Sequence, residues 1–126
     1  MSHERDGIDR LYHSVIGAFY EVYNTLGYGL FEQLYMKALE MELQDRGHVV
    51  RREVRAPVTY KGRVLGVQRL DMLVDEALIV EGKSTEFLSR TAPRQLRSYL
   101  RGTVFRHGLL LHFGAEPRFF RLGRGA

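Results

Sequence analysis

The sequence of 126 residues contains no cysteine. Disulfide bonds and thiolate metal sites are therefore excluded, and the composition agrees with a reducing, cytoplasmic environment. No apolar run approaches the ~20 residues that a membrane-spanning helix needs. The first six residues are too polar for a secretory signal. We therefore expect a cytoplasmic protein that does not cross a membrane.

Several common enzyme motifs are missing as well. The sequence has no Walker-type glycine loop, dinucleotide fingerprint or nucleophile elbow, and none of its five histidines forms a zinc-type pair at helical i, i+4 spacing. Nucleotide hydrolysis, hydride transfer and serine hydrolase chemistry are disfavoured. No repeat or long Pro/Gly/Ser stretch divides the chain, and its hydrophobic content of 44% supports one core. We expect a single domain over residues 1–126, with flexible tails at residues 1–8 and 123–126.

Hydrophobic periodicity predicts eight elements of secondary structure. In chain order they are helices at residues 9–25 and 30–46, a three-stranded meander over residues 48–84, a helix at residues 92–101, and strands at residues 109–113 and 118–122. Gly47 is placed to end the second helix, and Pro57 belongs on an edge strand or a bulge because it cannot donate to a ladder. The order ααβββαββ predicts a mixed α/β fold (α+β), with helices flanking a mixed sheet.

The most informative residues lie on the second and third predicted strands. Glu81 and Lys83 end an apolar strand and share one face, because side chains alternate along a strand. A carboxylate in such a strand needs a cation to offset the cost of desolvation. Asp71 interrupts the apolar strand before it, and a three-residue loop at 75–77 places Asp71 opposite Glu81. A two-residue loop would turn Asp71 to the other face. We expect the three-residue loop or an equivalent bulge.

Two adjacent carboxylates with a lysine beside them form an oxygen-rich site. Such a site suits a hard divalent cation, and Mg²⁺ or Mn²⁺ fits best. This ion can activate water and neutralise a phosphate oxygen while the lysine orients the water, which is the chemistry of phosphodiester hydrolysis. The alternative is a buried Asp/Glu/Lys cluster that only neutralises itself, because E-x-K alone is a common pattern.

Basic residues favour a polyanionic partner. The formal net charge is +4 and the pI is about 9.6. On the third predicted helix, one stripe repeats at spacings of four, three and four residues and consists of Arg90, Arg94, Arg97 and Arg101. The stripe is either a ridge that contacts phosphates or a solvated helix face. Gln95 and Tyr99 share another direction on the same helix.

These features also support a family resemblance. The matching segments, in chain order, are Gly29-Leu30-Phe31-Glu32-Gln33-Leu34-Tyr35, Tyr60-Lys61-Gly62, Arg69-Leu70-Asp71, Ile79-Val80-Glu81-Gly82-Lys83, Gln95-Leu96-Arg97-Ser98-Tyr99-Leu100 and Gly108-Leu109-Leu110-Leu111. With Asp71, Glu81 and Lys83 on the predicted scaffold, the sequence resembles the PD-(D/E)xK nuclease superfamily, whose shared core is αβββαβ. Within it, the sequence is most similar to the GxxExxY family. The resemblance extends from about residue 15 to residue 114.

The resemblance implies a role for each matching residue. It implies Asp71 and Glu81 as metal ligands, Lys83 as the catalytic lysine, and Glu32 as an additional acidic residue from the preceding helix. Glu32 has an alternative explanation, because an acidic residue in the first turn of a helix is favoured by the exposed N–H groups and the macrodipole. Tyr35 shares the face of Glu32, and an aromatic at that spacing is more often part of the core.

Gln95 and Tyr99 resemble the Q-x-x-x-Y element that helps to line the site and substrate channel of some nucleases in this superfamily. A packing role is the alternative for Tyr99. The sequence departs from the family pattern at Gly82, where a larger apolar residue is usual and where we expect the sheet to lose packing. It departs again at His112, where asparagine is common, and at Tyr23, where histidine is common.

The sequence therefore predicts a small metal-dependent nuclease acting on DNA or RNA. Arg94 and Arg97 are the residues expected to seat phosphates. Endo- and exonuclease action are both compatible with such a site. The alternative is a catalytically silent or partner-dependent module of the same fold that binds nucleic acid or protein. Because the domain is small, a homodimer or a protein partner is plausible.

Overall fold

The computed structural model describes the backbone of residues 2–123 and the side chains of residues 6–123. Its elements, in order, are α1 (Ser2–Leu26), α2 (Glu32–Asp45), β1 (Val50–Tyr60), β2 (Arg63–Val74), β3 (Leu78–Lys83), α3 (Thr91–Gly102), β4 (His107–Phe113) and β5 (Pro117–Gly123). This is the predicted order ααβββαββ. None of the helices in the described part of the chain is long and apolar enough to cross a membrane.

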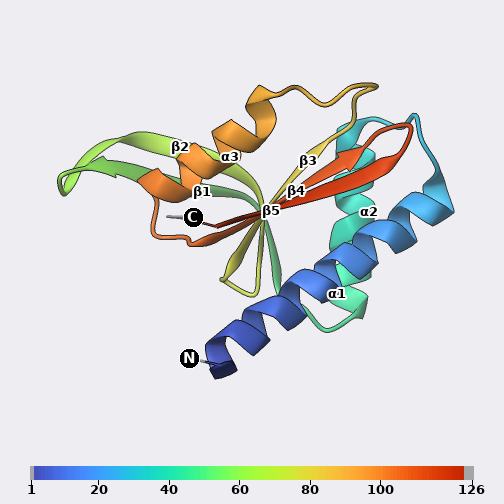
Figure 1. Cartoon of the computed structure of the whole chain (residues 1–126), viewed down its shortest axis with the longest axis horizontal. Coiled ribbons are helices and arrows are strands. Elements are labelled where there is room, and N and C mark those ends of the chain that lie inside the picture. The colour runs from blue at the N-terminus through green and yellow to red at the C-terminus, as the bar shows by residue number, and fades with distance from the viewer. Residues whose placement is uncertain (1, 124–126) are drawn as a thin grey trace.

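The strands form one mixed sheet in the order β1-β2-β3-β4-β5. Among the strand pairs of residues 2–123, only β3–β4 is parallel, and α3 provides the crossover that a parallel connection requires. Helices α1 and α2 cover one face of the sheet, and α3 covers the other (Figure 1). The predicted mixed α/β fold with flanking helices is confirmed.

Each face of the sheet has its own hydrophobic core. On the α1–α2 side, Phe113 lies between two aromatic rings, stacked on Tyr35 at 4.3 Å and edge-on to Phe19 at 4.9 Å. On the α3 side, Leu96 and Leu100 lie one helical turn apart and are buried against the sheet. The two cores fix α2 and α3 on opposite sides of β3, the strand that carries Glu81.

The connection between β2 and β3 is the predicted three-residue loop. Val74 pairs with Leu78, and the Ala77 N–H donates to the Val74 carbonyl at 3.0 Å. The register continues through Met72 opposite Val80 and therefore places residue 71 opposite residue 81. This prediction is confirmed, and it decides which side chains meet at the end of the ladder.

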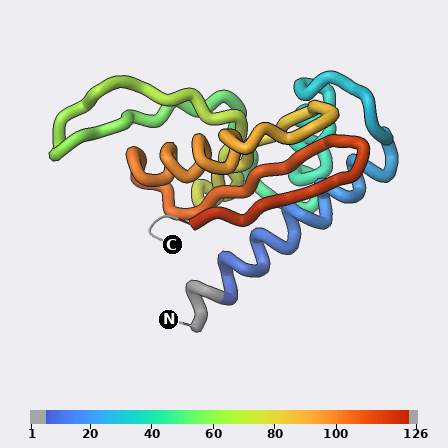
Figure 2. The backbone as a smooth tube through the Cα atoms, turned by 45° about the horizontal axis from the view of Figure 1, so that its top comes forward, coloured from blue at the N-terminus to red at the C-terminus, as the bar shows by residue number. Residues whose placement is uncertain are grey.

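The hairpin of β1 and β2 is longer than the rest of the sheet. Its outer half extends beyond the body of the molecule as an arm, shown in green in Figure 2. Pro57 lies in this arm on β1, which is an edge strand as predicted. The turn is at Lys61 and Gly62, both with positive φ. The arm leaves Val64 and Leu65 exposed at 65% and 70%.

Two details differ from the sequence predictions. α1 begins at Ser2, so residues 2–8, which we expected in a flexible tail, belong to a helix; residues 1 and 124–126 lie outside the described part. Around the start of α2, the spacing of Phe31, Leu34, Tyr35 and Ala38 predicts one buried helical face, but Phe31 and Leu34 are exposed at 83% and 51%. The buried face of α2 instead includes Tyr35 and Met36, because the stacking of Tyr35 on Phe113 turns Leu34 toward solvent.

Candidate active site

Asp71 and Glu81 lie where β2 and β3 separate. The last backbone pair of the β2–β3 ladder is Met72 with Val80. At the next position, each carboxylate accepts a hydrogen bond from the opposite strand. The Asp71 N–H donates to Glu81 Oε1 at 3.2 Å, and the Gly82 N–H donates to Asp71 Oδ2 at 3.3 Å. The side chains thus satisfy backbone groups that the interrupted ladder leaves unpaired. These two hydrogen bonds, one from each strand to the other, hold together the two carboxylates that we predicted to meet.

Glu81 is buried, with 9% of its surface exposed. Its pKa is raised from 4.5 to about 8, first by burial and then by the negative charge of Asp71, while the nearby Lys83 acts in the opposite direction. A second carboxylate and a buried environment both oppose ionisation of Glu81. A cation placed beside the pair would relieve both effects, so the electrostatics favour a bound positive charge.

Glu32 begins α2 and approaches the pair from the helix side. It stands in the first helical turn, as predicted. Burial raises its pKa, as does the charge of Asp71, whereas Lys83 and Arg52 lower it. Glu32 and Asp71 line one pocket of about 250 Å³. The structure therefore brings Glu32, Asp71, Glu81 and Lys83 into one electrostatic neighbourhood.

Arg52 on β1 also lines this pocket, although no motif in the sequence pointed to this residue. Its Nε donates to the Asp71 carbonyl at 3.2 Å, and its Nη1 lies 3.6 Å from Glu40 Oε1. The next residue, Glu53, has a positive φ of 55° and is skipped in the β1–β2 register. Such backbone strain often accompanies functional sites. Only the pairing of β1 with β2, which puts Arg52 opposite Met72, identifies this arginine.

The residues predicted on α3 lie elsewhere. Arg94, Gln95 and Arg97 are exposed, and Tyr99 is half-buried against the core on the α3 side of the sheet. None of them lines the pocket that contains Glu32 and Asp71. The structure therefore does not bring these four side chains into the carboxylate pocket.

Tyr35 has a structural position. Its side chain is fully buried, and its hydroxyl donates to the Gly27 carbonyl and accepts from the Leu30 N–H at 3.2 Å. The tyrosine thereby fixes the α1–α2 connection, which leads directly into Glu32. Its place in the core agrees with the structural alternative given by its spacing.

The departures from the family pattern are compensated by local contacts. The loss of packing expected at Gly82 does not occur, because the Met36 side chain fills the space that a Cβ would need. His112 is buried, and its Nε2 lies 2.8 Å from the Thr85 carbonyl oxygen. The Tyr23 hydroxyl donates to the Gly114 carbonyl at 2.5 Å. His112 and Tyr23 thus hold the segments that follow β3 and β4.

The donor chemistry of the site fits a hard divalent cation. No group of three or more His, Asp or Glu side chains is positioned to hold a metal among the described residues. Mg²⁺ commonly binds through only one or two carboxylates and completes its coordination with water and substrate phosphates. Asp71 and Glu81 are a donor set of this kind.

The mixed sheet, its α3 crossover and the carboxylates at the separation of β2 and β3 define a nuclease-like α/β fold. A family model described as the PD-(D/E)XK nuclease superfamily matches residues 9–122. The chain belongs to this superfamily, which supports a nuclease-type function in general. A search of curated proteins found no match.

A solved structure supports the fold. It is named "Crystal structure of SSO0001", and it superimposes with a TM-score of 0.57 at 17% sequence identity. The match covers 75% of this chain and 50% of the other. This chain therefore spans half the length of that protein. At this identity the likeness shows a shared fold alone.

Proposed function

We propose that the protein is a metal-dependent nuclease that hydrolyses phosphodiester bonds of DNA or RNA. The observation that carries the proposal is the pair formed by Asp71 and Glu81, two carboxylates held together at the end of a ladder with the pKa of Glu81 raised to about 8. Within the superfamily, the Gly29-Leu30-Phe31-Glu32-Gln33-Leu34-Tyr35 segment supports membership of the GxxExxY family.

In this proposal each residue of the site has a separate task. Asp71 and Glu81 hold Mg²⁺ or Mn²⁺, and Glu32 adds negative charge from α2. A bound divalent ion supplies a more acidic water and neutralises charge on the phosphate. Lys83 orients the attacking water or donates to a phosphate oxygen as charge develops there. Arg52 offsets part of the negative charge of the carboxylates, because its positive charge lowers the pKa of Glu32.

We propose that the substrate also contacts α3. Arg94, Arg97 and Gln95 are exposed, and Tyr99 lies next to them on the same helix. The arginines would seat phosphates that lie beyond the carboxylate pocket, which sets the position of the strand without reading its sequence.

A second candidate is a module of the same fold that is catalytically silent or needs a partner. The observation that favours it is that Lys83 and Arg52 already place positive charge beside Glu32 and Asp71, which partly neutralises the acidic cluster without a metal. A homodimer or another protein would then complete the site or present the substrate. We propose a cytoplasmic location for either form.

Metal binding to the isolated protein tests the proposal. Isothermal titration calorimetry with Mn²⁺ should show one site in the wild type and in Asp45→Asn, a matched change at an exposed position on α2. Asp71→Asn should weaken binding by more than the about 10–100-fold that changes in outer-shell partners cause. Equal Mn²⁺ affinity of Asp71→Asn and wild type would refute the ligand assignment.

A further inference from the structure

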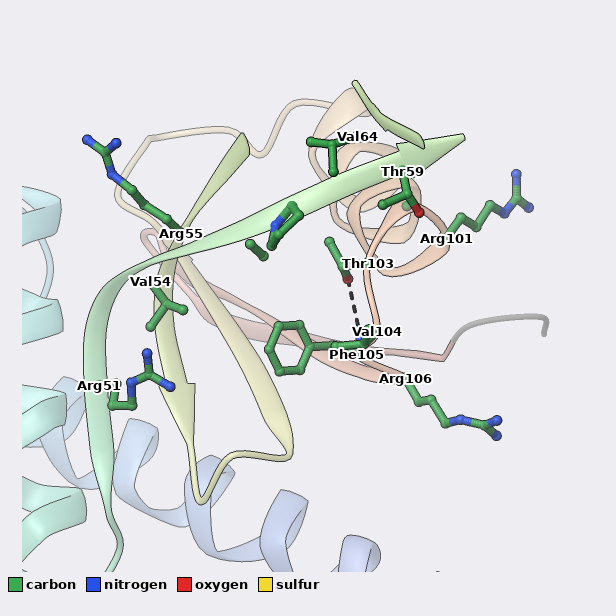
Figure 3. A pocket seen from close by; sticks show the side chains of 13 residues that line it. Arg51, Val54, Arg55, Thr59, Val64, Arg101, Thr103, Val104, Phe105 and Arg106 are labelled. Carbon is green, nitrogen blue, oxygen red and sulfur yellow. Dashed lines mark hydrogen bonds between the residues drawn. The ribbon is translucent and has the colours of Figure 1, made fainter. Parts of the chain in front are cut away.

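A second pocket lies between the β1–β2 arm and the end of α3 (Figure 3). It has a volume of about 860 Å³ and shares no lining residue with the carboxylate pocket. Its two walls are in close contact at Gly102, where an added Cβ would lie 2.8 Å from Val58 Cγ1. The pocket is therefore formed by elements that pack directly against each other.

The inner surface of this pocket is largely apolar. Val54 and Ala56 of β1 are buried, with 7% and 3% of their surface exposed, and Phe105 is half-buried beside them. Val64 and Val104 line the same pocket but are exposed at 65% and 82%. Apolar side chains that remain in contact with water favour a ligand with a flat or apolar part.

The outer margin of the pocket is basic. Figure 3 shows the guanidinium groups of Arg55, Arg101 and Arg106 pointing outward, away from the apolar side chains. None of these three arginines takes part in a salt bridge with another described side chain, and no lining residue is acidic. A fourth arginine, Arg51, donates two hydrogen bonds to Glu76. The margin thus presents unneutralised positive charge around an apolar centre.

We infer that this pocket binds an unpaired nucleotide of a nucleic-acid strand, with the base on the apolar surface and the neighbouring phosphates at the arginines. Stacking on apolar and aromatic side chains together with basic contacts to phosphates is the usual mode of single-strand binding. A duplex hides its base faces, so it would meet only the arginines. Arg101 is also the last residue of the α3 arginine stripe, so a strand lying along α3 reaches this pocket.

This inference rests on the proposed function only for the choice of nucleic acid as the ligand. It assigns a site separate from the carboxylates, which do not line the pocket. Binding at this site needs no metal, so it can be measured in chelator, where cleavage does not occur in the proposed mechanism.

The test measures fluorescence anisotropy of labelled single-stranded oligodeoxynucleotides in chelator. Val104→Glu puts a carboxylate into the pocket at an exposed position, and Val49→Glu makes the same change at another exposed position, 63% exposed and outside the pocket. We expect Val104→Glu to weaken binding about tenfold or more, as for one lost base contact, and Val49→Glu to have a much smaller effect. Arg101→Gln compared with Arg10→Gln, both at exposed positions, provides a second pair.

A strand of equal length with abasic sites tests the role of the base. We expect it to bind the wild type about tenfold more weakly than the normal strand and to lose less affinity than the normal strand on Val104→Glu. Equal binding of the two strands, or equal effects of Val104→Glu and Val49→Glu, would overturn the inference. Equal competition by a poly-glutamate peptide would also overturn it and indicate an acidic protein partner. If the pocket binds the strand but no substrate is cut with Mn²⁺, the nuclease proposal fails while this inference stands. If substrate is cut but the pocket does not bind the strand, this inference fails while the nuclease proposal stands.

Discussion

Met36 occupies the space beside Gly82 that any side chain at position 82 would need. Met36 lies one helical turn after Glu32 on α2, and Gly82 lies between Glu81 and Lys83 on β3. This contact therefore sets the distance between the helix that carries Glu32 and the strand that carries the other proposed catalytic residues. The glycine lets α2 approach the sheet.

Gly82→Ala should consequently destabilise the protein and displace α2. The new methyl group would overlap the Met36 side chain, which is itself 1% exposed and has little room to move. Overpacking of this kind costs roughly 1–3 kcal/mol. Urea unfolding measures this loss, and Mn²⁺ titration measures the accompanying effect on the site.

The double variant shows whether the contact itself is responsible. In a Met36→Ala background the space beside Gly82 is larger, so Gly82→Ala should cost less there than in the wild type. Equal costs in the two backgrounds would mean that the glycine is required for another reason.

Glu81 should make stability depend on pH. Its pKa is about 8 in the folded protein and 4.5 ordinarily, so the folded state binds more protons than the unfolded state between these values. Unfolding free energy should therefore fall as pH rises through this window, by up to about 1.4 kcal/mol per pH unit, and level off above it. Glu81→Gln removes the titrating group and should flatten the curve.

Urea unfolding in chelator from pH 5 to pH 9 measures the difference between wild type and Glu81→Gln. A bound divalent ion favours the ionised carboxylates, so Mn²⁺ should stabilise the wild type more at high pH than at low pH. Parallel curves for the two proteins would contradict the raised pKa.

The arginine stripe on α3 should contribute to nucleic-acid affinity through phosphates. Replacing Arg94 and Arg97 with alanine should weaken binding and reduce the slope of log affinity against log salt by about one unit for each lost contact. Oligonucleotide binding at several salt concentrations in chelator gives this slope. A slope equal to that of the wild type would identify the stripe as a solvated face.

The meeting of Asp71 and Glu81 could be predicted because it depends on local geometry. Side chains alternate along a strand, so the length of one loop decides whether the two residues face each other. The desolvation cost of two separate buried carboxylates favoured the three-residue loop, and the structure has it. The place of Glu32 in the first turn of α2 followed from similarly local signals.

Contacts between distant segments could not be predicted in this way. The burial of Met36 in place of Leu34 depends on Tyr35 stacking against Phe113, far away in sequence. The position of Arg52 beside Asp71 depends on the pairing of β1 with β2. Hydrophobic periodicity alone does not contain either relationship.

Cleavage assays with Lys83→Ala test the central claim most directly. Mixed DNA and RNA substrates are incubated with wild type, Lys83→Ala and the matched control Lys37→Ala, which changes an exposed lysine on α2. We predict cutting by wild type and control with Mn²⁺, none in chelator, and a loss of about 100-fold or more in Lys83→Ala. Cutting in chelator, or equal cutting by Lys83→Ala, would contradict a metal-dependent nuclease built on Asp71, Glu81 and Lys83.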